Sequence, residues 1–158
     1  MIELYSGTDK IRQLPKRKGG YFYIGLTNEV VQSFPKQKST RIVCSIDKGL
    51  SSFQCGLNHM GDGNFFIIIS TKNLKPLQKQ VDDQIDFTIF QDPNPLGVDI
   101  PESIQALLTQ DESLNSQFES LSLGKRRSII HRVKNIKNID LQISRTVQLI
   151  EEICFNQK

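Results

Sequence analysis

The stretch YFYIGLTNEVVQSF (residues 21–34) decides the fold, because a similar pattern returns as FFIIISTKNLKPL at residues 65–77. Each copy begins with the β-branched and aromatic residues typical of a half-buried strand. At a threonine the pattern then changes to one typical of a short helical turn. Thr27 and Thr71 are the expected N-caps of these turns, because a hydroxyl oxygen there accepts a hydrogen bond from a backbone N–H two or three residues on.

The repeat predicts a small barrel with internal symmetry. When Tyr21 is placed on Phe65, a gap of one residue brings RIVCSI (41–46) onto QIDFTI (84–89), and both segments have the composition of strands. Neither half has enough strands to bury its apolar face alone. We therefore expect the copies to pair about a pseudo-twofold axis and close a barrel. One more strand is expected before each copy, at residues 2–6 and 51–58.

Two glycine-containing segments separate these extra strands from the copies. Gly61-Asp62-Gly63 predicts a tight hairpin, because glycine accepts the positive φ that such a turn requires. The corresponding segment of the first half, DKIRQLPKRKGG (residues 9–20), is longer and basic, and we expect it to form a loop.

The β pattern ends at DPNPLGVDIPES (residues 92–103), where prolines and a glycine are typical of a linker. We expect a β-barrel domain at residues 1–92, a linker at 93–99 and a helical domain at 100–158, which makes the chain an α+β protein. Helices are predicted from Pro101 to about Leu108, from Asp111 to Leu121, from Ser122 through LGKRRSIIHRVKNIK, and from Asn138 or Asp140 to about Phe155.

The third predicted helix carries an arginine among its apolar residues. Arg126 falls on the same side as Ile129, Ile130, Val133 and Ile136. A guanidinium there requires a carboxylate or carbonyl oxygens, because an unpaired buried charge is very costly. We expect a structural partner, with Glu119 and Glu151 as candidates, in preference to a ligand. In the fourth helix the residues expected to face the core are Ile143, Val147, Ile150 and Cys154.

Composition narrows the class of protein but indicates no reaction. The chain has 158 residues and a net charge of +3, and it is polar without being disordered in composition. No apolar run is long enough to span a membrane and no secretory signal is visible, so we expect no membrane insertion. Cys44, Cys55 and Cys154 are odd in number and widely spaced, which favours a reducing cytoplasm over a disulfide framework.

The sequence shows no catalytic or metal-binding motif. Cys55 and His59 have the same strand parity and Cys44 could join them, but no dense ligand cluster is present, so packing is the expected role. We predict no metal and no cofactor, and favour a protein that is not an enzyme. An enzyme acting on a small anionic substrate, with His59 near the Gly61–Gly63 turn, remains an alternative.

Nucleic-acid binding is another alternative. Lys16-Arg17-Lys18 precedes the aromatic residues Tyr21 and Tyr23. Cations contact phosphates and aromatic rings stack on bases. The barrel class also resembles that of AbrB-like transition regulators, which bind DNA as dimers. The solvent face of the third helix adds further basic residues, Arg127, His131, Arg132 and Lys134.

The C-terminal pattern IPESIQALLTQDESLNSQFESLSLGKRRSIIHRVKNIK (residues 100–137) resembles the helical domain of the bacteriocin-protection, YdeI or OmpD-associated family. Three features carry the resemblance: Pro101 at a helix start, the step from Phe118 to Ser122, and the paired Arg126-Arg127. The N-terminal part is similar to the small barrel domain of unknown function that often precedes this domain. Its features are the strand GGYFYIGL (residues 19–26) and the loop from Met60 to Gly63.

The resemblance implies a double-split β-barrel followed by a helical domain, in a cytoplasmic bacterial protein with a role in envelope or antimicrobial-peptide stress. That role would be exerted through binding of a small anionic ligand or a protein partner. We expect the binding surface in a groove between barrel and helices. Its expected anion-binding residues are Arg126, Arg127 and Arg145, together with His59.

Overall fold

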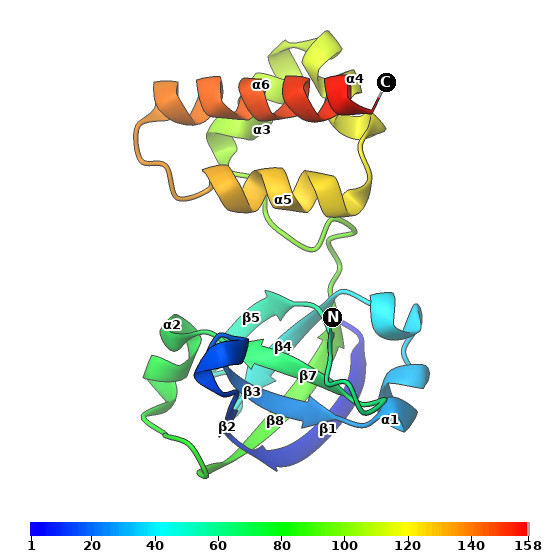
Figure 1. Cartoon of the computed structure of the whole chain (residues 1–158), viewed down its shortest axis with the longest axis vertical. Coiled ribbons are helices and arrows are strands. Elements are labelled where there is room, and N and C mark those ends of the chain that lie inside the picture. Colours follow the sequence, from blue (N-terminus) through cyan, green and yellow to red (C-terminus); the bar gives the residue numbers. More distant parts are fainter. Residues whose placement is uncertain (158) are drawn as a thin grey trace. The chain divides into compact units, whose positions relative to one another are not determined.

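The computed structural model describes residues 1–157. The chain divides into two compact units, Met1–Gly97 and a second that begins at Val98. This division falls inside the predicted linker at 93–99. The first unit is built from strands and short helical turns and the second from helices, which confirms the α+β prediction (Figure 1).

The first unit contains two antiparallel four-stranded sheets around one core. Their strand orders are β1-β8-β4-β5 and β2-β3-β7-β6. Each order, taken backwards, exchanges first-half strands for second-half strands, which is the predicted pseudo-twofold symmetry. The strands are β1 Glu3–Lys10, β2 Arg12–Gln13, β3 Phe22–Leu26, β4 Ile42–Ile46, β5 Ser51–Cys55, β6 Asn58–His59, β7 Phe65–Ile69 and β8 Gln84–Gln91. The short helical elements are η1 Lys16–Lys18, α1 Asn28–Gln32, η2 Gln37–Ser39, α2 Thr71–Leu74 and η3 Lys75–Leu77.

The register of the repeat differs by one residue from the prediction. Strand β3 begins at Phe22 and β7 at Phe65, and the same spacing of 43 positions relates Ile42 of β4 to Ile85 of β8. The predicted placement of Tyr21 on Phe65, with a later gap, is therefore wrong, and the correct alignment needs no gap. Successive strand residues face opposite sides, so a slip of one residue exchanges core and surface positions. The equivalent pairs Ile24/Ile67, Leu26/Ile69, Ile42/Ile85 and Ile46/Ile89 are all buried.

The two helical turns begin at equivalent caps. Thr27 accepts a hydrogen bond from the Val30 N–H at 3.4 Å, as predicted. In the second half the cap is Ser70, which accepts from the Asn73 N–H at 3.2 Å, and Thr71 is the first residue of α2. The prediction of Thr71 as the cap is wrong for the same reason as the alignment: it was one residue out of register.

The strand before each copy passes from one sheet to the other. In the first half β1 continues to Lys10, the chain crosses at the fully buried Ile11, and β2 follows, so part of the predicted loop at 9–20 is strand. In the second half the predicted strand at 51–58 is interrupted between β5 and β6. A spacing of 46 positions relates these segments, because Arg12 pairs with Tyr23 and Asn58 pairs with its equivalent, Phe66.

The segment after β8 is attached to the barrel by hydrogen bonds. Asp92 accepts from the Gln54 side chain at 3.1 Å and from the Asn94 N–H at 2.9 Å. Asn94 in turn accepts from the Leu96 N–H at 3.0 Å. The beginning of the predicted linker is therefore an ordered part of the first unit.

The second unit consists of four helices, α3 Glu102–Gln110, α4 Glu112–Ser120, α5 Leu123–Val133 and α6 Ile139–Asn156. Asp111, Ser122 and Asn138 cap the last three. Helix α5 ends earlier than predicted, and Ile136 lies beyond it. The buried face of α6 is formed by Gln142, Thr146, Leu149 and Ile150, so the prediction is correct for Ile150, whereas Ile143, Val147 and Cys154 are half-buried.

Gln142 explains this shift towards polar residues. Its side-chain amide donates to the Val133 carbonyl at 3.0 Å, at the end of α5, and its side-chain oxygen accepts from the Ser103 hydroxyl of α3. Thr146 donates to the Gln142 carbonyl at 2.7 Å. Buried polar groups are tolerated where they are hydrogen-bonded. Gln142 and Thr146 can therefore lie on the buried face of α6, although a search for apolar residues alone would not place them there.

Candidate binding pocket

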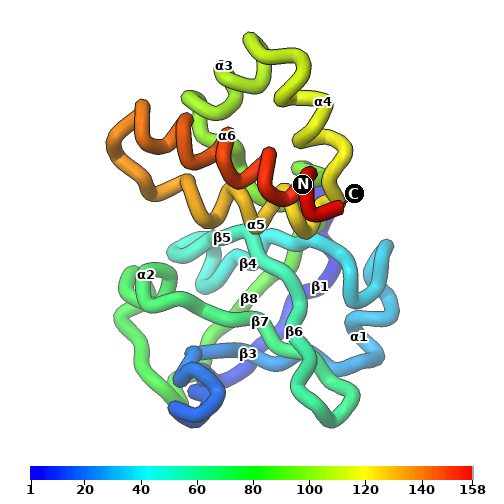
Figure 2. The backbone as a smooth tube through the Cα atoms, turned by 45° about the horizontal axis from the view of Figure 1, so that its top comes forward, coloured from blue at the N-terminus to red at the C-terminus, as the bar shows by residue number. Residues whose placement is uncertain are grey.

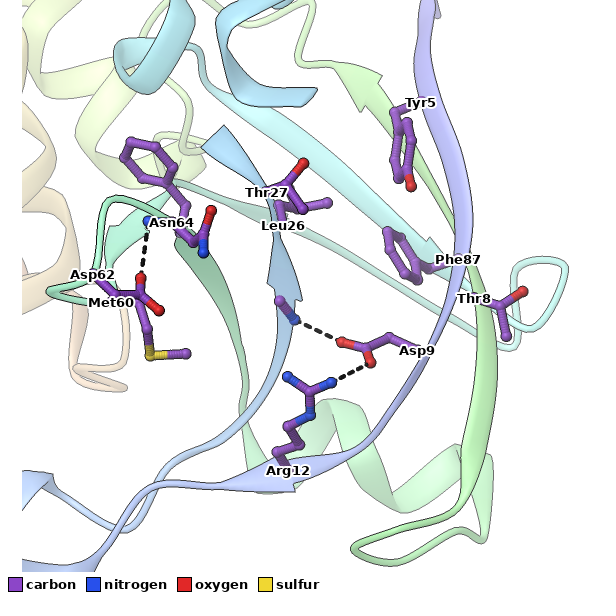
Figure 3. Close-up of a pocket in the computed structure, with 12 residues that line it drawn as sticks. Tyr5, Thr8, Asp9, Arg12, Leu26, Thr27, Met60, Asp62, Asn64 and Phe87 are labelled. Atoms are coloured by element: carbon purple, nitrogen blue, oxygen red, sulfur yellow. Dashed lines mark hydrogen bonds and ion pairs between the residues drawn. The ribbon is translucent and has the colours of Figure 1, made fainter. Parts of the chain in front are cut away.

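A pocket of about 310 Å³ opens in the first unit, and we call it the Arg12 pocket (Figure 3). It combines the end of β1, the β3–α1 junction, β8 and the β6–β7 hairpin. Figure 3 shows Asp9, Phe87 and Tyr5 on one side of β3, with Met60, Asp62 and Asn64 on the other. The residues that line it are Tyr5, Thr8, Asp9, Arg12, Gly25, Leu26, Thr27, Met60, Asp62, Asn64, Phe65 and Phe87.

Asp9 organises the polar side of the pocket. One carboxylate oxygen accepts from the Gly25 N–H at 2.9 Å, and the other accepts from the Arg12 guanidinium at 2.9 Å and from the Lys10 N–H at 2.8 Å. Strand β2 pairs with β3 only at Phe22 and Tyr23, so the Gly25 N–H lies beyond the end of β2. The carboxylate therefore replaces a missing strand partner and fixes the arginine at the same time.

Arg12 is held in place but is open to a ligand. Its side chain is 51% exposed, and Asp9 is its one polar partner within residues 1–157. The guanidinium lies beside Gly25, where a Cβ atom would be 3.6 Å from Nη1. A larger side chain at Gly25 would occupy the space that the guanidinium now borders.

The pocket also contains a second carboxylate, Asp62, which accepts from the Asn64 N–H at 2.9 Å, and two hydrogen-bond donors that are open to a ligand. The Asn64 side-chain oxygen accepts from the Asn28 N–H at 3.0 Å, which leaves its NH₂ group without a partner in the described chain. The Tyr5 hydroxyl likewise has no partner there, while its ring contacts that of Phe87 at 6.0 Å between centroids. Donors beside aromatic and aliphatic side chains match a small anion that carries an apolar group.

The second half of the barrel lacks these groups. At the positions equivalent to Asp9, Arg12 and Gly25 it has Cys55, Asn58 and Ile68, as the register of the two halves shows. Desolvation by burial is the main cause that raises the pKa of Cys55, so this position carries a neutral thiol instead of a carboxylate. The pocket is therefore a departure from the repeat and not a consequence of it.

Arg126 has the structural partner that its position predicted. Its guanidinium donates to the carbonyls of Leu121 at 2.9 Å and Glu119 at 2.7 Å, and lies 6.0 Å from the centroid of the Phe118 ring. The acceptors are backbone carbonyls at the end of α4, not the carboxylates of Glu119 or Glu151. Such carbonyls have no partner within their own helix, so Arg126 stabilises the junction between α4 and α5.

The other predicted site residues do not line the Arg12 pocket. Arg145 donates to the Gln148 side chain at 2.9 Å on α6. His59 is exposed, with its ring 5.0 Å from that of Phe65. Residues Lys16, Arg17 and Lys18 form η1 in the first unit, whereas Arg127, Arg132 and Lys134 lie on α5 or at its C-terminal end in the second.

The cysteines of the barrel are packed side chains. Cys44 is fully buried, and burial raises its pKa to about 12. Within residues 1–157 no group of three or more histidine, cysteine or acidic side chains is arranged to hold a metal ion. Nor does that part of the chain contain a helix with the length and apolar character needed to cross a bilayer.

Together the fold and the pocket define a duplicated double-split barrel with one specialised half, joined to a unit of four helices. Residues 8–89 match the model of a family described as a Domain of unknown function (DUF1905), and residues 97–154 match one described as Bacteriocin-protection, YdeI or OmpD-Associated. The first match covers more than half of the chain, which therefore belongs to that family and carries a C-terminal domain of the second. No curated protein and no solved structure matches the chain.

Proposed function

We propose that this chain is a non-catalytic binding protein that holds a small organic anion in the Arg12 pocket. The observation that carries the proposal is the departure of Asp9, Arg12 and Gly25 from the repeat. At the equivalent positions the other half has three uncharged residues, Cys55, Asn58 and Ile68. Asp9 completes the strand edge at Gly25, but the second half forms the same backbone without a carboxylate or an arginine at these positions.

The geometry favours binding of a carboxylate or phosphate with an apolar group. Arg12 is oriented by Asp9 before the ligand arrives, which lowers the entropy cost of forming a charge-assisted hydrogen bond worth about 1.5–3 kcal/mol. The ligand's apolar part would lie against Phe87, Leu26 and Met60. At about 310 Å³ the pocket suits a ligand smaller than a nucleotide.

The same groups argue against catalysis. Asp9 uses both oxygens to hold Gly25, Lys10 and Arg12, so it is not available as a base. No cysteine or histidine lines the pocket, and His59 is outside it. The enzyme alternative has no observation in its favour.

A role in resistance to bacteriocins or antimicrobial peptides, exerted in the cytoplasm, is the physiological part of the proposal. It is supported by the description of the family that matches residues 97–154. The three free cysteines support a reducing compartment. Survival under bacteriocin challenge should fall when the gene is deleted, and return with the wild-type chain but not with Arg12→Gln.

Binding is tested by amide chemical shifts during titration with small acids, namely benzoate, hexanoate and phenyl phosphate. We expect the Gly25 and Asn64 signals to move with at least one of them, and Arg12→Gln to weaken that affinity by about 10-fold or more. Arg132→Gln removes an exposed arginine outside the pocket and is the matched control. Shifts that are absent with all three acids, or that survive Arg12→Gln, would reject the proposal.

A further inference from the structure

A second feature of the barrel has no part in the Arg12 pocket: three consecutive cations on the turn η1. Lys16, Arg17 and Lys18 are all exposed. None of their side chains has a hydrogen-bond or ion-pair partner within residues 1–157. Three adjacent like charges form a strongly basic patch, which attracts an anionic partner.

The turn that carries these cations is fixed by its backbone. The Lys18 N–H donates to the Pro15 carbonyl at 2.8 Å, and the turn ends at Gly19 with a φ of 96°. At its base the Leu14 N–H donates to the Tyr21 carbonyl at 2.9 Å. A rigid turn presents its charges at lower entropy cost than a flexible loop does.

An exposed aromatic ring accompanies the cations. Tyr21 is 50% exposed, and its ring covers Gly19 so closely that a Cβ atom there would overlap it. The ring is therefore held beside the turn, where it can contact a flat group. A ring beside cations matches a base followed by phosphates, because each base has an aromatic face that stacks.

The basic surface continues onto the second half of the barrel. Figure 1 shows the turn, in blue, near α2, in green, and in Figure 2 the turn lies beside the green segment that follows α2. Phe22, the first residue of β3 after the turn, lines one shallow depression with Leu74 of α2, so the start of β3 and α2 are neighbours. Lys72 and Lys75 are exposed on this segment and also have no side-chain partner among residues 1–157.

The pseudo-symmetric counterpart of this surface has the opposite sign. It consists of the hairpin at 60–64 and the segment 27–34 around α1, which carry Asp62 and Glu29 and no lysine or arginine. The corresponding segments of the basic surface, 14–21 and 70–77, carry five cations and no acidic residue. The charge difference is therefore specific to one copy.

We propose that this surface binds single-stranded nucleic acid, with phosphates on the cations and a base stacked on Tyr21. A purely acidic protein would use the same charges but would gain little from the ring, so the exposed tyrosine favours nucleic acid. The surface is formed by Lys16, Arg17, Lys18, Tyr21, Lys72 and Lys75.

Fluorescence anisotropy of the full chain with a labelled oligo-dT and a labelled oligo-U tests the proposal over a range of salt concentrations. The triple variant Lys16→Gln/Arg17→Gln/Lys18→Gln should bind about 10-fold or more weakly and lower the salt slope by about 2, since each phosphate contact on a single strand contributes about 0.7. Tyr21→Ala should weaken binding by about 5-fold or more with an unchanged slope.

The matched control is Lys36→Gln/Lys38→Gln/Lys48→Gln, which removes three exposed cations from other parts of the barrel. It should retain at least a third of the wild-type affinity. Three results would overturn the proposal: no binding of either oligomer at low salt, equal loss in the control, or competition by polyaspartate as strong as that of unlabelled oligo-dT. All substituted residues are exposed, so we expect every variant to fold, and melting curves check this.

Discussion

The two halves of the barrel have the same backbone plan but different chemistry. Buried positions repeat as aliphatic pairs such as Ile24 and Ile67, which face each other across the β3–β7 ladder. Positions at the rim do not repeat, as Asp9 and Cys55 show. Duplication therefore explains the fold, and divergence at the rim occurs at the surfaces for which we propose binding.

The largest effect expected from this comparison lies in the core. Ile24→Ala and Ile67→Ala each remove a side chain that is 0% exposed, and each should lower the free energy of unfolding by about 2–5 kcal/mol. Chemical denaturation measures both. Because the two residues face each other across the pseudo-twofold axis, we expect the two losses to be similar. A loss confined to one variant would show that only one half carries the core.

The next largest effect is a difference in stability loss between equivalent rim positions of the two halves, Asp9 and Cys55. Asp9→Ala leaves the Gly25 N–H without its acceptor and should cost about 1–3 kcal/mol, with faster hydrogen exchange at Gly25. Its counterpart Cys55→Ala removes one small side chain and should cost about 1 kcal/mol. Denaturation together with amide exchange provides the measurement. Unchanged exchange at Gly25 would mean that Asp9 does not complete the strand.

A pH effect is expected at another divergent pair, Cys44 and Phe87. Burial raises the pKa of Cys44 to about 12, so the folded chain keeps a proton that the unfolded chain releases above about pH 9. Stability should therefore fall as pH rises from about 9 towards 12, and one such thiol accounts for about 1.4 kcal/mol at pH 10. Cys44→Val should make the decline shallower. An identical pH profile in the variant would contradict the assignment.

The smallest effect concerns the turns. Gly61 has a φ of 96° and open space around its Cα, so Gly61→Ala should cost about 1 kcal/mol, from backbone strain alone. Gly19 has the same φ, but a methyl group there would also displace the Tyr21 ring. Thermal melts should rank Gly19→Ala as the more destabilising of the two. The reverse order would show that the ring does not rest on the turn.

Much of the fold follows from local patterns in the sequence. The repeat, the hairpin at Gly61–Gly63 and the caps Ser122 and Asn138 are determined by residue type and spacing. The register error arose because FFIIIS offers five consecutive apolar residues, so the sequence does not show which of them face the core. Burial decides this: Ile67 and Ile69 are inside, while Ile68 is partly exposed.

The Arg12 pocket was not predicted, for a related reason. Asp9 and Arg12 lie in a segment that was expected to be a loop, and Gly25 lies in the middle of a strand, with Asp62 on a separate hairpin. Only the crossing at Ile11 and the pairing of β3 with β7 bring them together. With the correct register, the replacement of Ile68 by Gly25 would have been a visible signal. Arg126 was predictable because its partners are only five and seven residues away.

The order of the strands in the two sheets also affects how the chain folds while it is being synthesised. Strand β1 leaves the ribosome first, yet its ladder is made with β8, the last strand of the unit. Such pairing of distant segments is intrinsically slow. The β1–β8 ladder can therefore form only after residues 84–91 have been synthesised.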